Sequence, residues 1–256
     1  WRGKNGDWEK GRCVLYIKEC ALYGVSVWSE VLEKGYGRRM LESCERVALY
    51  GCLKVCRTVS TEAMEILMGE LPWNFEARMR SIAYRIKKGM IDDVVLEWVS
   101  RTILDEKGMK GSMKYVQEKM YEKWQEKWNA SEKGRVTQEF IPEVSEIRKK
   151  EWFDPSLYAC YLMTGHGSLN QFLYDRKLRE DPMCDCGKGS ENWKHVLIEC
   201  ELYEDIRNLN EMGIRTNAGI ISVSGCLDTK EHFERLNEYA RMVFERRKNR
   251  NVQMNE

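Results

Sequence analysis

The chain has 256 residues, of which 43% are apolar and 32% charged, and 42 Lys and Arg against 41 Asp and Glu leave a formal net charge of +1. This length is enough to bury a core, which excludes a random coil, and the balanced charge gives no general attraction for a polyanion. With 4 Pro and abundant Glu, Lys, Leu and Met, the composition favours one or two mainly helical domains.

Residues 1–57 predict two helices. Residues 1–11 are expected to be a tail rather than a secretory signal, because they contain no apolar stretch. Apolar residues from Arg12 to Gly24 favour a helix that Gly24 closes in the left-handed conformation. A longer helix is predicted from Arg38 to Arg57, and its expected buried stripe consists of Met40, Leu41, Cys44, Val47, Ala48, Cys52, Val55 and Cys56.

The next segments add further helices up to residue 128. Ser60 is a predicted N-cap for a helix that ends at Gly69, and Pro72 marks the start of another that Gly89 stops. Residues 91–104 and 112–128 predict two more helices. The second of these carries Met113, Val116, Met120, Trp124 and Trp128 at close to i+4 steps.

A change of period between residues 130 and 150 predicts a domain junction, with a short extended segment over 136–144. Asp154 and Pro155 are expected to start a helix that runs to Thr164, and Ser168 to cap the one after it. A short helix is predicted from Tyr203 to Met212. The last helix should begin at a capping box of Asp228 and Glu231 and reach Arg250.

The ten cysteines are spread over a chain that is long enough to fold without disulfide bonds, which favours a reducing compartment. Three of them form the pattern Cys184-x-Cys186-x8-His195-x4-Cys200, and these four side chains are the ligand set that tetrahedral zinc prefers. Four protein ligands close the coordination shell, so the zinc would be structural and would stabilise the fold of residues 182–207. The alternative is that Cys186 and Cys200 are core residues and Cys184 is a loop thiol, since Cys-x-Cys is shorter than the usual knuckle.

Two other groups of residues could carry chemistry, but each has a simpler interpretation. Asp92 and Asp93 resemble paired metal-binding carboxylates, whereas their position after Gly89 favours the N-terminus of a helix. His166, between two glycines, could be a catalytic base, but no nucleophile motif accompanies it, so it is interpreted as a turn residue.

Several clusters of cations lie near aromatic residues, a combination that suits phosphates and unstacked bases. Helix ends also carry such charges for their own stability, so this alternative stays open at each cluster. The candidate nucleic-acid-binding residues are Arg85, Lys87, Lys88, Lys133, Arg135, Arg148, Lys149, Lys150, Trp193 and Lys194, and a further basic run is Arg246, Arg247, Lys248 and Arg250.

Taken in order, four segments and the Cys/His cluster resemble the carboxyl-terminal part of a polyprotein of type-1 non-LTR retrotransposable elements, which insert into arthropod ribosomal DNA. The segments are LYIKECALYGVSVW (15–28), KVCRTVSTEAMEILMGELP (54–72), WNASEKGRVTQEFIPEV (128–144) and WFDPSLYACYLMTGHGSLNQFL (152–173). The resemblance implies a parent with an endonuclease and a Mg²⁺-dependent reverse transcriptase, and it matches Cys184, Cys186, His195 and Cys200 to the family's zinc knuckle. The aspartates of the polymerase have no counterpart here, so no catalytic residue is assigned.

The resemblance also implies a mainly α fold and a set of regions. These are a tail (1–11), the helical end of the polymerase with a thumb-like bundle (12–130), connector helices (131–181), the CCHC zinc knuckle (182–213) and a C-terminal helix with a basic end (214–256). The implied partners are element RNA, target DNA and the remainder of the polyprotein, and no membrane is among them. The implied location is intracellular, with action in the nucleus. The competing hypothesis is a zinc-stabilised architectural or protein-interaction module without nucleic-acid binding.

Overall fold

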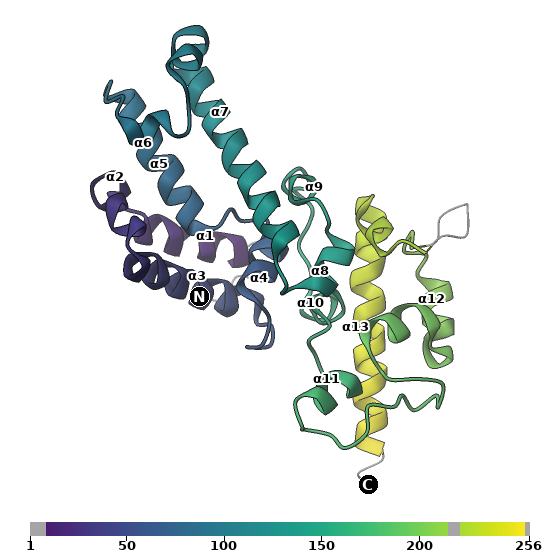
Figure 1. The fold of residues 1–256 in the computed structure, drawn as a ribbon. Coiled ribbons are helices and arrows are strands. Elements are labelled where there is room, and N and C mark those ends of the chain that lie inside the picture. Colours follow the sequence, from purple (N-terminus) through teal and green to yellow (C-terminus); the bar gives the residue numbers. More distant parts are fainter. Residues whose placement is uncertain (1–8, 215–220, 254–256) are drawn as a thin grey trace. The chain divides into compact units, whose positions relative to one another are not determined.

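The structure is a computed structural model that describes residues 9–214 and 221–253 (Figure 1). The described part is mainly helical, as predicted, and forms two compact units. Unit 1 comprises residues up to Leu53 together with Met68–Ser131 and Glu143–Ser145, and unit 2 comprises Lys54–Leu67, Glu132–Pro142 and Glu146 onward. Of the predicted tail, residues 1–8 lie outside the described part, and the first helix already begins at Glu9.

Unit 1 is a bundle of helices. Its elements are α1 (Glu9–Ala21), α2 (Val25–Trp28), the 3-10 helix η1 (Ser29–Glu33), α3 (Gly35–Leu53), α5 (Trp73–Lys87), α6 (Asp93–Leu96) and α7 (Arg101–Ala130). The short α9 (Val144–Arg148) spans the boundary between the units. Helices α5, α6 and α7 enclose a core cluster formed by Ile82, Ile86, Val95, Trp98, Val99, Val116 and Met120. Helices α1 and α3 pack against each other.

Several sequence-predicted boundaries in and next to unit 1 are confirmed by specific interactions. The hydroxyl of Ser60 accepts a hydrogen bond from Ala63 N at 3.2 Å, which caps α4 (Thr61–Met68). Pro72 directly precedes α5. Gly24 and Gly89 both adopt the positive φ that lets a glycine end a helix, at +63° and +71°.

Two predictions in unit 1 are wrong, although the helix expected over 112–128 is confirmed as part of α7. The helix expected over 91–104 is instead the four-residue α6 followed by the start of α7, whose axis breaks at Gly108. The break follows from φ +61° and ψ −175° at Gly108, a conformation that side-chain-bearing residues avoid. In the predicted helix over 38–57, Val55 and Cys56 lie beyond the end of α3, and Met40, Cys44 and Val47 are exposed rather than buried.

Gly37 fixes the approach of α3 to η1. A Cβ atom at this position would overlap the carbonyl oxygen of Val31, whereas a Cβ at Gly51 of the same helix would meet nothing within 4 Å. We therefore expect Gly37→Ala to destabilise the protein by about 1–3 kcal/mol through this overlap. The matched variant Gly51→Ala should cost nothing and could gain up to about 1 kcal/mol from helix propensity. Denaturant unfolding of both variants measures the contrast, and equal stabilities would contradict this account of α3 packing.

Unit 2 is organised around its C-terminal helix. Its elements are α4 up to Leu67, α8 (Arg135–Phe140), α10 (Leu157–Thr164), α11 (Asn170–Asp175), the π-helix η2 (His195–Glu199), the 3-10 helices η3 (Glu201–Tyr203) and η4 (Val223–Leu227), α12 (Glu204–Leu209) and α13 (Lys230–Gln253). Helices α10, α12 and η4 pack against α13 (Figure 1). The buried stripe of α13 consists of Phe233, Leu236, Tyr239, Ala240, Val243 and Phe244, and the ring of Tyr158 stacks on Phe244 at 5.3 Å.

Four local predictions in unit 2 are wrong. Residues 136–144 do not form an extended segment, because Gly134 starts α8 with φ +70° and the apolar Val136, Phe140 and Val144 repeat every four residues. The N-cap of α10 is Ser156, whose hydroxyl accepts from Ala159 N at 3.2 Å, and not Asp154. The last helix is capped by Thr229, which accepts from His232 N at 3.1 Å, one residue after the predicted Asp228.

The fourth concerns Ser168, which is exposed and does not cap α11. The amide of Asn170 instead donates to the carboxylate of Glu191, 21 residues further along the chain, at 2.9 Å.

In the described residues, no helix combines the length and the apolar character that a membrane crossing would require.

Candidate metal centre

Cys184 and Cys186 lie on a short hairpin-like loop. Met183 and Ser190 pair as an antiparallel bridge, and Cys184 N donates to Gly189 O at 2.8 Å. Between Met183 and Ser190 the chain turns at Gly187, which has a φ of +73° and whose amide donates to Cys184 O at 2.9 Å. The following amide, of Lys188, donates to Cys186 Sγ at 3.4 Å. The turn at Gly187 therefore directs a backbone amide toward a sulfur.

His195 and Cys200 come from the π-helical turn η2, in which Cys200 N donates to His195 O at 2.7 Å. In an α-helix, residues five positions apart point about 140° away from each other. The i→i+5 hydrogen bond of a π turn widens the helix, so that the first and sixth residues face the same side. This local geometry brings the imidazole and the thiol to one point.

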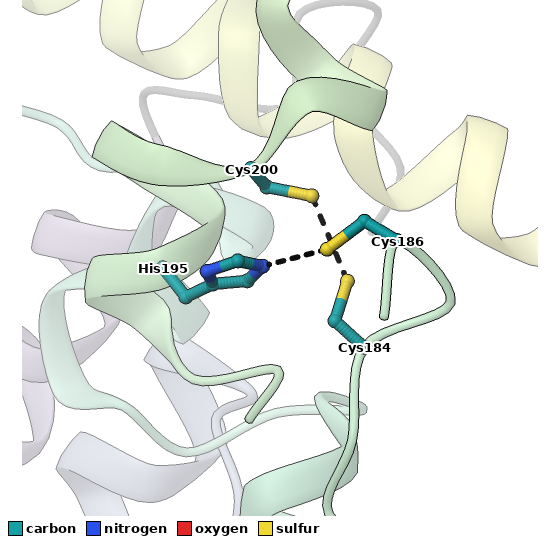
Figure 2. A group of neighbouring side chains, drawn as sticks. All are labelled: Cys184, Cys186, His195 and Cys200. Atoms are coloured by element: carbon teal, nitrogen blue, oxygen red, sulfur yellow. Dashed lines mark hydrogen bonds between the residues drawn. The ribbon is translucent and has the colours of Figure 1, made fainter. Parts of the chain in front are cut away.

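The four side chains converge in unit 2 (Figure 2), and their ligand atoms all lie within 4.8 Å of one another. Cys184 Sγ lies 3.6 Å from Cys200 Sγ, and Cys186 Sγ lies 3.2 Å from His195 Nε2. Around a tetrahedral zinc ion, bond lengths of about 2.3 Å to sulfur and 2.0–2.1 Å to nitrogen give edges of roughly 3.8 and 3.6 Å. The arrangement therefore fits one ion after side-chain shifts of about 1 Å at the widest edge.

The surroundings orient and bury these ligands. Cys184, His195 and Cys200 are buried and Cys186 is partly buried. His195 Nδ1 lies 3.3 Å from the carboxylate of Glu199, which is four residues later in the chain, and this leaves Nε2 to face the sulfurs. A carboxylate on the second ring nitrogen is the usual partner of a metal-binding histidine. Glu199 was not predicted, although its position four residues after His195 is a signal that could have identified it.

The thiols of Cys184 and Cys200 are hydrogen-bonded to each other, so that one proton lies between their sulfurs. Their mutual hydrogen bond, together with burial, raises the pKa of the Cys184 thiol, and the same bond lowers the pKa of the Cys200 thiol. A metal ion bound to both sulfurs would displace this proton, so its affinity would fall as the pH falls.

The π turn is anchored to the rest of unit 2 by side chains that the sequence did not single out. Tyr239 on α13 donates its hydroxyl to Val196 O at 2.6 Å. Arg207 on α12 donates to Leu197 O at 3.0 Å and to Cys200 O at 2.7 Å. These bonds satisfy carbonyls that the end of a helical turn leaves open. No local sequence signal identifies them, because their partners are distant in the chain.

A buried ion pair supports the loop that carries the first two cysteines. Arg247 on α13 donates to Glu191 Oε2 at 2.9 and 2.7 Å, with side chains only 6% and 1% exposed. Arg247 also donates to the side-chain oxygen of Asn170, whose amide nitrogen donates to Met183 O at 2.6 Å. Arg247, predicted as part of a basic run, is thus a buried structural residue.

The predicted nucleic-acid-binding residues lie in different surroundings. In unit 1, Arg85 is engaged by Asp92 and Glu30, while Lys87 and Lys88 are exposed. In unit 2, the exposed side chains are Lys133, Arg135, Arg148, Lys149 and Lys194, whereas Lys150 and Trp193 are partly buried. Trp193 packs on Phe140 with ring centroids 5.3 Å apart.

The other two candidate groups have structural roles. Asp92 is the N-cap of α6 and accepts from Val95 N at 3.1 Å, as its position after Gly89 predicted. His166 lies in the loop between α10 and α11, where Nδ1 lies 2.9 Å from the hydroxyl of Thr58. Burial lowers the pKa of His166, and the nearby charge of Arg176 adds to this.

Fold and site together define a mainly helical protein with a four-ligand Cys/His cluster in its second unit. No family model matches the chain, and no solved structure matches it. It is 43% identical over 253 residues to a retrovirus-related Pol polyprotein from type-1 retrotransposable element R1 of Bradysia coprophila, a match that covers 94% of this chain and 24% of the relative. An R1 Pol polyprotein of Nasonia vitripennis is 39% identical over 226 residues, which are 88% of this chain and 55% of that protein.

A 115 kDa protein in the type-1 element R1DM of Drosophila melanogaster is 36% identical over 259 residues, with 94% of this chain and 24% of the relative covered. The chain is therefore a homologue of the Pol polyproteins of type-1 R1 retrotransposable elements, which confirms the resemblance predicted from its motifs. It spans about a quarter to about half of the length of these relatives.

Proposed function

We propose that this chain is a nucleic-acid-binding part of a retrotransposon polyprotein, in which a structural zinc ion is held by Cys184, Cys186, His195 and Cys200. The observation that carries the proposal is the convergence of these four ligand atoms within 4.8 Å. Three thiols and one imidazole suit zinc, and a shell of four protein ligands leaves no position for a reactive water. The ion would therefore stabilise a surface and not catalyse a reaction.

The proposed role of this surface is to hold element RNA or target DNA during target-primed reverse transcription in the nucleus. The parent polymerase, with its Mg²⁺ ions, would supply the chemistry. Lys194 is exposed directly before the ligand His195, and Trp193 beside it is partly exposed. A cation next to an aromatic ring suits a phosphate next to an unstacked base. The segment that leads into the cluster adds the exposed Arg176, Lys177 and Arg179.

Binding of labelled RNA and single-stranded DNA, followed by fluorescence anisotropy between about 50 and 200 mM salt, tests this proposal. We expect Cys186→Ser to weaken binding at least tenfold, because the metal site that orders the neighbouring contact residues loses a ligand. Lys194→Gln should weaken binding and lower the salt slope by about one, as the loss of one phosphate contact does. The matched control is Lys230→Gln on α13, since Lys230 is also exposed but lies 3.6 Å from Glu234. Binding that Cys186→Ser leaves unchanged would contradict a role for the metal site.

A second candidate function is a zinc-stabilised architectural or protein-interaction module. It is favoured by the acidic partners of the cations around the cluster, since Lys188 pairs with Glu201 and Arg246 pairs with Asp205 at 2.6 Å. Arg250 lies 3.8 Å from Asp185. Cations that are already paired attract phosphate less strongly. Absence of any binding at about 50 mM salt, with the metal in place, would select this function.

A further inference from the structure

Helix α1 and the turn after it present apolar side chains to solvent. Cys13, Tyr16, Cys20 and Tyr23 follow one another at intervals of three and four residues, and all four are exposed. Tyr16 is 73% exposed and Tyr23 is 86% exposed. This spacing defines one face of a helix, and here it is the face opposite the buried Val14 and Leu22.

Helix α3, which packs on α1, carries a second such stripe. Tyr36, Met40, Cys44 and Val47 recur at intervals of four, four and three residues, and all are exposed. The exposed fractions of Tyr36, Met40 and Val47 are 71%, 58% and 70%. We call the two stripes together the α1/α3 apolar face. Single exposed apolar residues are common, but eight on α1, the turn after it and α3 indicate an interaction surface.

One charged residue of each helix is directed inward. Lys18 of α1 is 7% exposed and pairs with Glu70, and Glu45 of α3 is 1% exposed and accepts from Trp73 N at 3.0 Å. Each helix therefore has an exposed apolar stripe in addition to its buried side, and its buried charge is paired or hydrogen-bonded inside unit 1. A helix that is apolar on both sides is typical of an element enclosed between two layers. Unit 1 supplies one of these layers.

We propose that the α1/α3 apolar face binds another segment of the Pol polyprotein, which supplies the second layer. The length of the relatives supports this occupant, since the 253 matched residues are only 24% of the Bradysia coprophila polyprotein and leave about three quarters of it outside this chain. Such a segment would bring apolar side chains to Tyr16 of α1, to Tyr23 after it, and to Met40 and Val47 of α3. The proposal depends on the homology and not on the metal or on nucleic-acid binding.

The native cysteines of the face provide a direct test, because Cys13, Cys20 and Cys44 belong to it and Cys160 and Cys226 are buried in unit 2. Maleimide labelling, followed by mass spectrometry, compares the chain alone with the same chain placed in the Bradysia coprophila polyprotein instead of its matched 253 residues. We expect the three thiols of the face to react rapidly in the isolated chain and at least tenfold more slowly in the polyprotein. An added thiol at the exposed Ser145, from Ser145→Cys, should react equally in both.

A second measurement keeps the test decisive if the polyprotein that carries this chain in place of its own segment folds poorly. The remainder of the polyprotein is supplied as a separate polypeptide, and its association with the chain is measured. Val47→Asp should abolish association without changing the melting temperature of the isolated chain, while Ser43→Asp, exposed on the same helix, should not. Equal labelling in both forms, or association that Val47→Asp does not weaken, would overturn the proposal. It would also be overturned by protection of the thiols in the isolated chain, and sedimentation would then show whether a second copy covers the face.

Discussion

Removal of the metal should destabilise unit 2 and release residues 182–207. These residues are held by the four converging ligands and by a few hydrogen bonds from α12 and α13, such as the one from Tyr239 to Val196. Binding of an ion to the folded state adds RT ln(1 + [L]/Kd) to stability, about 4 kcal/mol when free metal is roughly 1,000 times its Kd. We expect one zinc ion per chain by elemental analysis, and loss of amide protection over 182–207 on chelation.

Two buried cysteines offer a matched pair of variants for this prediction. Cys200 and Cys226 are both 0% exposed, and Cys226 donates to Val223 O outside the cluster. Cys226→Ala should cost about 1 kcal/mol, the ordinary effect of a core substitution. Cys200→Ala should cost several times more in unit 2 and abolish zinc binding, because it removes a ligand. Amides of unit 1 should keep their protection in both variants, and equal stabilities with no bound zinc would refute the metal site.

The metal cluster could be predicted because its ligands lie within 17 residues and their chemistry is specific. The start and end of α5 were predicted for the same reason, since Pro72 and Gly89 act on their own neighbours through φ. In each case the information is local. The π turn at His195 is also local, but no residue type in 195–199 distinguishes it from an α turn.

Two of the failures, at Ser168 and in the stripe of α3, depend on what lies against these residues and not on their neighbours in the sequence. Ser168 is a good cap by type, yet the amide of Asn170 is satisfied by Glu191, a position that only the folded chain makes available. The apolar stripe of α3 was assigned to the core because periodicity reports which face is apolar and not what covers it. Met40 and Val47 belong to this apolar stripe, and both are exposed in this chain.

The buried pair of Glu191 and Arg247 should be the most sensitive ionic contact in unit 2. Arg247→Met removes the cation and leaves the 1% exposed carboxylate of Glu191 without compensation, which costs about 3–5 kcal/mol in such pairs. The loss should extend to the metal site, because Glu191 N donates to Pro182 O at 2.8 Å at the base of the cysteine loop. Urea unfolding together with zinc content measures both effects.

The adjacent residue provides the control. Arg246 pairs with Asp205 at 2.6 Å, but its side chain is 37% exposed and that of Asp205 is 61% exposed. Arg246→Met should therefore cost less than about 1 kcal/mol and leave zinc binding intact. Replacing both partners, with Arg247→Met and Glu191→Leu, should recover part of the loss, since no buried charge then remains. Recovery should be incomplete, because the amide of Asn170 loses its acceptor. If Arg247→Met and Arg246→Met proved equally mild, the ion pair could not be what holds the cysteine loop against α13.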